Sequence, residues 1–387
     1  MCGIVAYVGT KEAYPIIIKG LKRLEYRGYD SAGVSIGNKD GILVLKEKGK
    51  VADLEAYAAE RDSTGLIGIG HTRWATHGVP NQVNAHPHLS GDGKLSLIHN
   101  GIIENYDSIK QTLISKGHTF KSDTDTEVLV HLIEYFKEKE QVNLFEAVRL
   151  ALNHVVGAYA IIVMEQGINN EFIAARKGSP LVIGIGEGEY FVASDASPIV
   201  EYTREVVYLG DGEIARINKD EELDIKTIAN VSKTPFIQEL ELSLEAIEKG
   251  GFSSFMLKEI FEQPKIVIDT LRGRINPETK EITLGGISDY EQKIMNADRI
   301  IIVACGTSWH AGLIGEYLFE DLARISVEVE YASEFRYRNP IINENDVVLA
   351  ISQSGETADS LAALELAKEK GATLLGICNV VGSSIPR

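Results

Sequence analysis

Short apolar runs bounded by glycine, aspartate or asparagine fill most of the first 220 residues, and strand-like and helix-like segments alternate after residue 299. The first pattern keeps strands and helices in separate stretches, which favours an antiparallel α+β domain of layered sheets with flanking helices. The second pattern predicts parallel strands joined by helical crossovers. We therefore expect two folding units of different class.

In the first unit, Asp125 or Thr126 is the expected N-cap of the longest helix. The expected strands are "CGIVAYVG", "SAGVSIG", "GILVLKEKG", "LIGIGHTRW" and "KLSLIHNGI", followed by further strands from "GAYAIIVMEQ" to "EVVYLGDGEIARIN". The expected helices, which have apolar residues at helical spacing, are "EAYPIIIKGLKRLEY", "DTEVLVHLIEYFKEKE" and "NLFEAVRLALNHV".

The second unit follows a polar and acidic stretch that contains "NKDEELDIKT" and "ELELSLEAIEKGG". We expect residues 2–220 to form the first domain, residues 221–252 a linker, and residues 253–387 a second domain with a doubly wound parallel sheet. The chain stops at "GSSIPR", shortly after the last expected strand. We therefore expect this sheet to be incomplete at the C-terminus and the chain to be a fragment of a longer protein.

Charge and cysteine content limit the partners and the compartment. The net charge of −17 argues against a nucleic-acid or anionic-membrane partner, because the field of the whole molecule would repel polyanions. The three cysteines, Cys2, Cys305 and Cys378, are far apart and form no CxxC motif, which is typical of a reducing cytosol. The apolar run after Cys2 is shorter than the roughly 20 residues that span a bilayer. We expect a cytoplasmic protein.

Cys2 would become the N-terminal residue if Met1 were removed, which a small side chain at position 2 permits. Its thiol would then lie close to a free α-amine, whose ordinary pKa of about 7.7–8.0 leaves a useful fraction unprotonated at neutral pH. That amine can take the thiol proton, directly or through a water, and so generate a thiolate nucleophile without a histidine. Position alone is equally compatible with a buried structural cysteine.

Three further stretches favour the nucleophile. Arg73 in "GHTRWATHG" suits a substrate carboxylate, because its planar guanidinium binds one bidentately. Asn100 and Gly101 in "IHNGII" offer a side-chain amide and a backbone N–H, which together can stabilise the oxyanion of acyl transfer. Asp125 in "SDTDTE" can hold a substrate ammonium, although a helix N-cap is the alternative role.

Together these motifs resemble the class II glutamine amidotransferase domain, an N-terminal-nucleophile hydrolase with an αββα sandwich. The resemblance covers nearly all of residues 2 to about 220. It implies that Cys2 attacks the glutamine γ-amide and that Asn100 and Gly101 form the oxyanion hole. The motifs that carry it are "MCGIVAYVG", "LEYRGYDSAG", "HTRWATHG", "NAHPH", "HNGIIEN" and "TDTE".

The same resemblance implies the glutamine-binding residues. Arg73, with help from Thr76 and His77, would contact the glutamine carboxylate, and Asp125 would contact its ammonium group. Trp74 corresponds to the family's gate residue for the passage of ammonia.

Five histidines lie within a short span, and "HPH" raises the question of a metal site. No cysteine or carboxylate completes a recognisable zinc spacing, so we expect these residues to surround the glutamine pocket instead. We expect no metal and no cofactor. The histidines are His71, His77, His86, His88 and His99.

In the second unit, "ACGTS" and "SQSGET" each lie between an apolar strand and a helix. Hydroxyl residues and helix N-termini at such positions suit a phosphate, whereas neither stretch has the pattern of a nucleotide-binding loop. Each motif alone could be an ordinary N-cap, but two in adjacent βα units favour a ligand site. The hydroxyl and amide residues concerned are Thr307, Ser308, Ser352, Gln353, Ser354 and Thr357.

"ACGTSWHAG", "ASEFRYR" and "SQSGETADS" resemble the first sugar-isomerase (SIS) domain of the glutamine–fructose-6-phosphate aminotransferase (isomerizing) family. In that family the hydroxyl loops bind the sugar phosphate. At the domain junction, Ser254 stands where the family usually has a histidine.

The two resemblances imply an enzyme that takes L-glutamine and fructose 6-phosphate to glucosamine 6-phosphate, as a homodimer in the full-length protein. For this chain alone we expect glutaminase activity without the coupled synthase activity. The alternatives are another class II amidotransferase, such as the asparagine synthetase or phosphoribosyl amidotransferase types, and a sugar-phosphate-binding or sensing module without catalysis.

Overall fold

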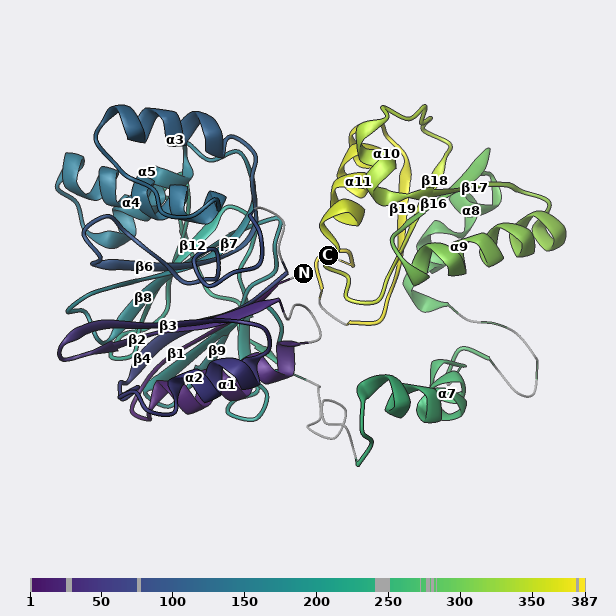
Figure 1. Cartoon of the computed structure of the whole chain (residues 1–387). Coiled ribbons are helices and arrows are strands. Elements are labelled where there is room, and N and C mark those ends of the chain that lie inside the picture. The colour runs from purple at the N-terminus through teal and green to yellow at the C-terminus, as the bar shows by residue number, and fades with distance from the viewer. Residues whose placement is uncertain are drawn as a thin grey trace. The chain divides into compact units, whose positions relative to one another are not determined.

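The computed structural model describes residues 2–25, 30–74, 78–240, 251–271, 273–275, 279, 282, 284–380 and 383–386. The chain divides into two compact units, Met1–Glu248 and Lys249–Arg387 (Figure 1).

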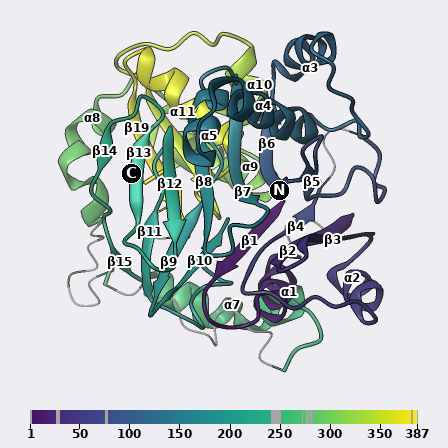
Figure 2. The same cartoon turned by 90° about the vertical axis from the view of Figure 1, so that its left-hand side faces the viewer.

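The first unit contains two sheets in which the paired strands are antiparallel (Figure 2). Within the described residues, the eight strands of the first sheet have the order β15 (Gln238–Glu239), β11 (Glu205–Tyr208), β9 (Val182–Gly186), β10 (Glu189–Ala193), β1 (Gly3–Val8), β4 (Ile67–Arg73), β2 (Ser31–Asn38) and β3 (Gly41–Lys48). The seven described strands of the second sheet have the order β14 (Ser232–Lys233), β13 (Asp224–Thr227), β12 (Glu213–Asn218), β8 (Glu171–Lys177), β7 (Gly157–Glu165), β6 (Leu95–Ile103) and β5 (His88–Leu89).

Helices cover the outer face of each sheet (Figure 1). On the first sheet these are α1 (Ala13–Leu24) and α2 (Val51–Ala58). On the second sheet they are α4 (Asp125–Glu140) and α5 (Leu144–Leu152), and α3 (Tyr106–Ser115) packs against α4.

A continuous apolar core joins the inner faces of the two sheets. Ile4 and Ile69 from the first sheet are fully buried with Ile98, Ile162 and Phe172 from the second. Two sheets packed on each other with helices outside both make the αββα sandwich, so the predicted fold class of this unit is confirmed. Because β1 pairs with β10 on one side and β4 on the other, all six of its residues are buried.

The second unit is built around a parallel sheet with the strand order β17 (Ser326–Tyr331), β16 (Arg299–Ala304), β18 (Val347–Ser352) and β19 (Thr373–Cys378). The helix α9 (Thr307–Leu318) covers one face, where Gly312 packs against Ile302, and a π-helical turn at Phe319–Ala323 continues it. The helices α10 (Ala332–Tyr337) and α11 (Ala358–Glu369) cover the other face. The predicted doubly wound parallel sheet is thus confirmed.

Before this sheet come α7 (Phe255–Leu271), a 3-10 helix (Gly285–Tyr290) and α8 (Glu291–Met295). No helix among the described residues is both long enough and apolar enough to cross a membrane.

The structure differs from the sequence-based expectations at the start of α4. Its N-cap is Thr124, whose side chain accepts a hydrogen bond from the Glu127 amide at 3.3 Å, so the expectation of Asp125 or Thr126 was wrong. The reason is that the helix already begins at Asp125. The N-cap is the residue before the first helical residue, and its side chain accepts the amide of the third helical residue, which here is Glu127.

Two segments also form secondary structure that their amino-acid composition did not predict. The strands β13, β14 and β15 lie within residues 221–252, the stretch expected to be the linker, and extend the two sheets beyond residue 220. These strands add few apolar side chains to the core, and Ile225 is one of the few that are buried. Short strands at the edge of a sheet leave most of their side chains in water. Likewise α10 replaces the end of an expected strand, since Ala332 and Phe335 are buried at helical spacing.

Replacing Ile162 by alanine should lower the free energy of unfolding of the first unit by about 2–5 kcal/mol, because the side chain is fully buried between the sheets. The transition can be followed by Trp74 fluorescence in urea in a Trp309→Phe background, since the chain has two tryptophans, one in each unit. The matched control is Ile114→Ala on α3, where the side chain is 47% exposed and a change within about 0.5 kcal/mol is expected. Equal losses for the two variants would contradict the inter-sheet core.

Candidate active site

Cys2 lies directly before β1, and the backbone of Trp74 holds its sulfur. The Trp74 amide donates to Sγ at 3.2 Å, and the thiol donates to the Trp74 carbonyl at 3.6 Å. Burial raises the pKa of the Cys2 thiol above its ordinary value, and the hydrogen bond from the Trp74 amide opposes this shift. The thiol therefore needs a nearby base if it is to react at neutral pH.

Asn100 is attached to the same residue by its side chain. Its Nδ2 donates to the Cys2 carbonyl at 3.0 Å, while its Oδ1 lies 2.9 Å from Nε2 of His71. The same Nε2 lies 3.0 Å from the carbonyl of His99, so both neighbours are acceptors and Nε2 carries the proton. Burial lowers the pKa of His71 to about 3, so the ring is neutral and fixes the orientation of the Asn100 amide.

Gly101 occupies a backbone position that only glycine tolerates. Its φ is +140°, and a Cβ built there would lie 2.0 Å from the carbonyl oxygen of Ala158 on β7. The glycine thus lets β6 stay paired while its backbone approaches the pocket beside Cys2.

A small pocket beside Cys2 brings together most of the residues singled out in the sequence. Asn100 lies at its edge through the bond to the Cys2 carbonyl. Thr76 and His77 lie outside the described residues. The pocket is lined by Cys2, Arg73, Trp74, His86, His99, Gly101, Thr124, Asp125 and Thr126.

The two charged side chains of the pocket are both buried. The Nη2 of Arg73, on the last residue of β4, donates to the Gly78 carbonyl at 3.2 Å. Asp125 is the first residue of α4, and its Oδ2 accepts the Ile103 amide at 2.9 Å. The N-terminus of a helix stabilises a carboxylate, because the unpaired amides there carry partial positive charge. One pocket therefore presents a cation and an anion of the kinds that an amino acid requires.

Thr124 and Thr126 are pocket residues that the sequence analysis did not assign to the site. The Oγ1 of Thr126 lies 2.8 Å from Nε2 of His86 and 3.0 Å from Nδ1 of His99, and the Oγ1 of Thr124 lies 3.1 Å from Nε2 of His88. Their positions on either side of Asp125 in "SDTDTE" were the available signal. The three ring nitrogens thus face hydroxyl groups, and burial lowers the pKa of His86 and His88 well below the ordinary value.

In the second unit, the two hydroxyl loops emerge at the same edge of the sheet. Because β16 and β18 are parallel neighbours, with Ala304 opposite Ile351, the segments that follow them start side by side. The chain passes from β16 outward to β17 and returns to β18 on the other side of β16, so these loops flank the point where the strand order reverses. Open α/β sheets bind ligands at this point.

No side chain of these loops makes a capping hydrogen bond at the described start of the helix that follows. The N-cap of α9 is Gly306 and that of α11 is Thr357, and neither makes a side-chain cap hydrogen bond. In the second loop, the Oγ of Ser352 accepts the Gly355 amide at 2.9 Å and lies 3.3 Å from the Oγ1 of Thr357. The Oγ of Ser354 accepts the Glu356 amide at 3.2 Å. Thr307 and Gln353 are exposed and Ser308 is half-buried.

Comparisons with known proteins define the class. Residues 71–215 match the family model of the glutamine amidotransferase domain, and residues 293–387 match that of the SIS domain. The fold is similar to that of a glutamine phosphoribosylpyrophosphate amidotransferase from B. subtilis solved with ADP and GMP, with a TM-score of 0.52, 23% identity, and coverage of 98% of this chain and 81% of that chain. Residues 71–215 are thus similar to a glutamine amidotransferase domain and residues 293–387 to a SIS domain.

Over its whole length, the chain is a relative of glutamine–fructose-6-phosphate aminotransferase (isomerizing). It is 62% identical over 388 residues to the protein of that name from Bacteroides thetaiotaomicron and 59% identical over 391 residues to that from Chlorobaculum tepidum. All of this chain is covered in both alignments, and it spans 63% of the length of each relative.

The stability of the first unit should fall as the pH drops below about 6.5. The pKa values of His71, His86 and His88 are depressed in the folded state, so below the unfolded value only the unfolded chain takes up these protons. Each such imidazole contributes a slope of about 1.4 kcal/mol per pH unit. Urea unfolding at several pH values between 7 and 5.5 measures this change in the free energy of unfolding.

The variant His88→Gln should reduce this pH dependence of the unfolding free energy by the contribution of one imidazole. A slope that His88→Gln does not alter would show that this imidazole is not held neutral.

Proposed function

We propose that the first unit is a glutaminase whose nucleophile is Cys2, and that in the whole protein it supplies ammonia for making glucosamine 6-phosphate from fructose 6-phosphate. The observation that carries the proposal is the convergence on one pocket of a thiol, a buried guanidinium, a buried carboxylate and the Gly101 backbone. The identity to the named aminotransferases supports it.

Recognition of glutamine uses the two buried charges. Arg73 binds the α-carboxylate through its planar fork, with Thr76 and His77 as additional contacts, and Asp125 binds the α-ammonium. The γ-amide is then directed toward Cys2. Trp74, whose side chain is 51% exposed, lies at the boundary of the pocket, as expected of a residue that controls the passage of ammonia.

Catalysis begins when the Cys2 sulfur attacks the γ-carbonyl carbon of glutamine. After removal of Met1, the α-amine of Cys2 takes the thiol proton, which meets the need for a base created by the raised pKa of the thiol. The Asn100 amide and the Gly101 N–H stabilise the oxyanion of the tetrahedral intermediate. Return of the proton to the nitrogen releases ammonia and leaves a γ-glutamyl thioester, which water hydrolyses to glutamate and free thiol.

The second unit binds the phosphate of fructose 6-phosphate between its two hydroxyl loops. Thr307 and Ser308 come from the first loop, and Ser352, Gln353, Ser354 and Thr357 from the second. The location at the strand-order reversal supports this assignment. Backbone amides at both helix N-termini add favourable dipoles for an anion.

In the whole protein, we propose that ammonia from the first unit condenses with the carbonyl group of fructose 6-phosphate with loss of water, and that isomerisation of the resulting imine gives the amino sugar. No cofactor is needed, because the nucleophile, base and oxyanion donors all come from the chain. We further propose a cytoplasmic homodimer that binds neither nucleic acid nor membrane, in keeping with the net charge of −17.

The variant Cys2→Ala should reduce glutamate formation from glutamine by at least about 1,000-fold, because the nucleophile is lost. A form that retains Met1 or an N-terminal tag should be equally inactive while its urea unfolding curve is unchanged, since only the base is blocked. Glutamate release by the purified chain is the measurement, and Cys378→Ala on β19 is the matched cysteine control. Activity in the tagged form would refute the amine as base.

Fructose 6-phosphate should raise the melting temperature of the second unit, and the double variant Ser352→Ala, Thr357→Ala should weaken binding by about 10-fold or more, because hydrogen bonds to a charged phosphate are lost. The control is Ser326→Ala, at an exposed hydroxyl on the opposite edge of the same sheet. Equal binding in all forms would contradict the site.

The same melting experiment separates the two classes of function. Stabilisation by fructose 6-phosphate without any glutaminase activity would indicate a sensing module. A response to glutamine that is lost when Cys2 is alkylated would support the amidotransferase.

A further inference from the structure

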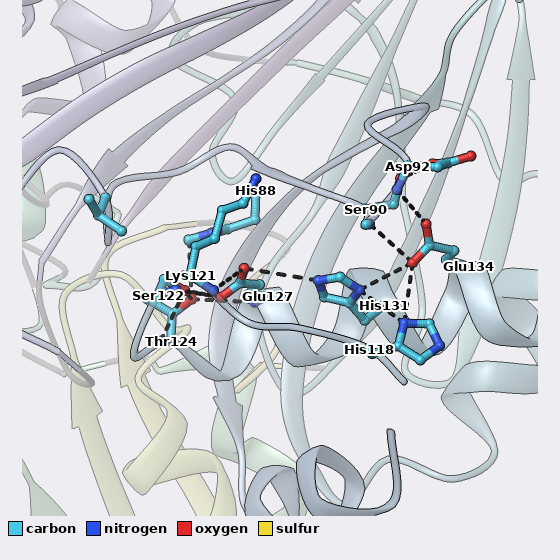
Figure 3. Close-up of polar contacts among 12 residues, drawn as sticks. His88, Ser90, Asp92, His118, Lys121, Ser122, Thr124, Glu127, His131 and Glu134 are labelled. Atoms are coloured by element: carbon cyan, nitrogen blue, oxygen red, sulfur yellow. Dashed lines mark hydrogen bonds and ion pairs between the residues drawn. The ribbon is translucent and has the colours of Figure 1, made fainter. Parts of the chain in front are cut away.

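We propose that His118, His131 and Glu134 form a binding site for a divalent transition-metal ion, with zinc as the preferred ion. The three side chains come from α4 and from the loop between α3 and α4, outside the pocket beside Cys2 (Figure 3). This departs from the sequence-based expectation of no metal, which considered only the histidines between residues 71 and 99. The proposal does not depend on the proposed function.

The spacing of the three ligand atoms suits a tetrahedral ion. Nδ1 of His118 lies 3.2 Å from Nδ1 of His131, and Oε2 of Glu134 lies 3.1 Å from the latter and 3.4 Å from the former. Zinc bonds to nitrogen and oxygen of about 2.0–2.1 Å place tetrahedral ligands about 3.3–3.4 Å apart. The three atoms thus approximate one face of a zinc tetrahedron, and a water can take the fourth position.

The chemistry of the donors selects the class of ion. Two imidazoles and one carboxylate favour zinc and its neighbours among the transition metals, whereas magnesium and calcium prefer sites built from oxygen alone. Two ring nitrogens that face each other at 3.2 Å also need either a shared proton or a cation between them. A divalent ion satisfies both nitrogens and the Glu134 carboxylate together.

The surrounding residues hold these ligands in the orientation that a metal requires. The amides of Gly91 and Asp92 donate to the Glu134 carboxylate at 3.0 and 2.9 Å. On the far side of His131, Nε2 lies 3.9 Å from Oε1 of Glu127 (Figure 3). If Nδ1 of His131 binds the ion, Nε2 carries the proton and points toward this carboxylate, which is the carboxylate–histidine–metal arrangement of many zinc sites.

Glu127 is itself fixed, because its carboxylate accepts the amides of Lys121 and Ser122 at 2.9 and 2.6 Å. The site is mostly closed, with side-chain exposures of 2% for His131, 8% for Glu134 and 14% for His118. Glu134 also lines a surface pocket, which gives an ion a route to the site. The ion would tie the loop before α4 to the helix, a structural role.

The test is zinc binding by the full 387-residue chain after treatment with a chelator, measured by calorimetry and by competition with a chromophoric chelator. We expect one zinc ion per chain and a higher melting temperature with zinc. The variants His118→Gln and Glu134→Gln should weaken binding by more than about 100-fold, and Glu127→Gln by about 10–100-fold. His154→Gln, at an exposed position in the same unit, should bind like the unchanged protein.

A second comparison separates this site from the reactive thiol. The variant Cys2→Ser should keep full zinc affinity, and cobalt bound in place of zinc should show the visible bands of a tetrahedral site without a thiolate charge-transfer band. Loss of binding in Cys2→Ser, unchanged binding in His118→Gln, or no binding by the unchanged chain would each overturn the proposal. If the unchanged chain binds no zinc, His118, His131 and Glu134 are held together by hydrogen bonds alone. If Glu134→Gln does not fold, His118→Gln decides, because its loop position is half-buried.

Discussion

The pairing of β1 with β4 is the constraint on which the first unit depends. Gly3 lies opposite Thr72 in this antiparallel pair, so Cys2, which directly precedes β1, comes to the end of β4, where its sulfur contacts the Trp74 backbone. A shift of one residue would turn every side chain of β1 to the other face and remove the inter-sheet core together with the site. Burial of β1 on both faces makes such a shift costly, and Cys2 is therefore held by the rigid sandwich.

The second sheet contributes the rest of the site through β6 and α4. Asn100 and Gly101 lie on β6 and face Cys2 because the two sheets pack on each other, and Asp125 starts the helix that covers the outer face of the second sheet. Since the Ile103 amide on β6 donates to Asp125, strand and helix hold one another at the pocket. The site is thus a product of three layers of the sandwich.

Much of this arrangement could be predicted from the sequence, because strong local patterns carry it. The strands β1, β2, β3, β4 and β6 and the parallel sheet follow from apolar runs, whereas the placement of Arg73, Gly101 and Asp125 in one site was implied by the resemblance of their motifs to the glutamine amidotransferase domain. The N-cap at Thr124, the helix α10 and the edge strands β13–β15 depend on tertiary contacts that propensity does not encode. The hydroxyl partners of the buried histidines, Thr124 and Thr126, belong to the same group, since only folding brings residues 86–99 against α4.

Histidine side chains contact the helix α4 in two different environments, one formed by a hydroxyl group and one by carboxylates. Near its N-terminus, ring nitrogens of His86 and His99 lie within hydrogen-bond distance of the Thr126 hydroxyl, which can donate one hydrogen bond and accept others. Further along the helix, His131 lies between the carboxylates of Glu127 and Glu134. Buried charge of this kind is tolerated only when it is paired. The pocket beside Cys2 and the proposed metal site thus use different parts of one helix: Asp125 and Thr126 of the first turn line the pocket, and His131 and Glu134 of the second and third turns are the proposed ligands.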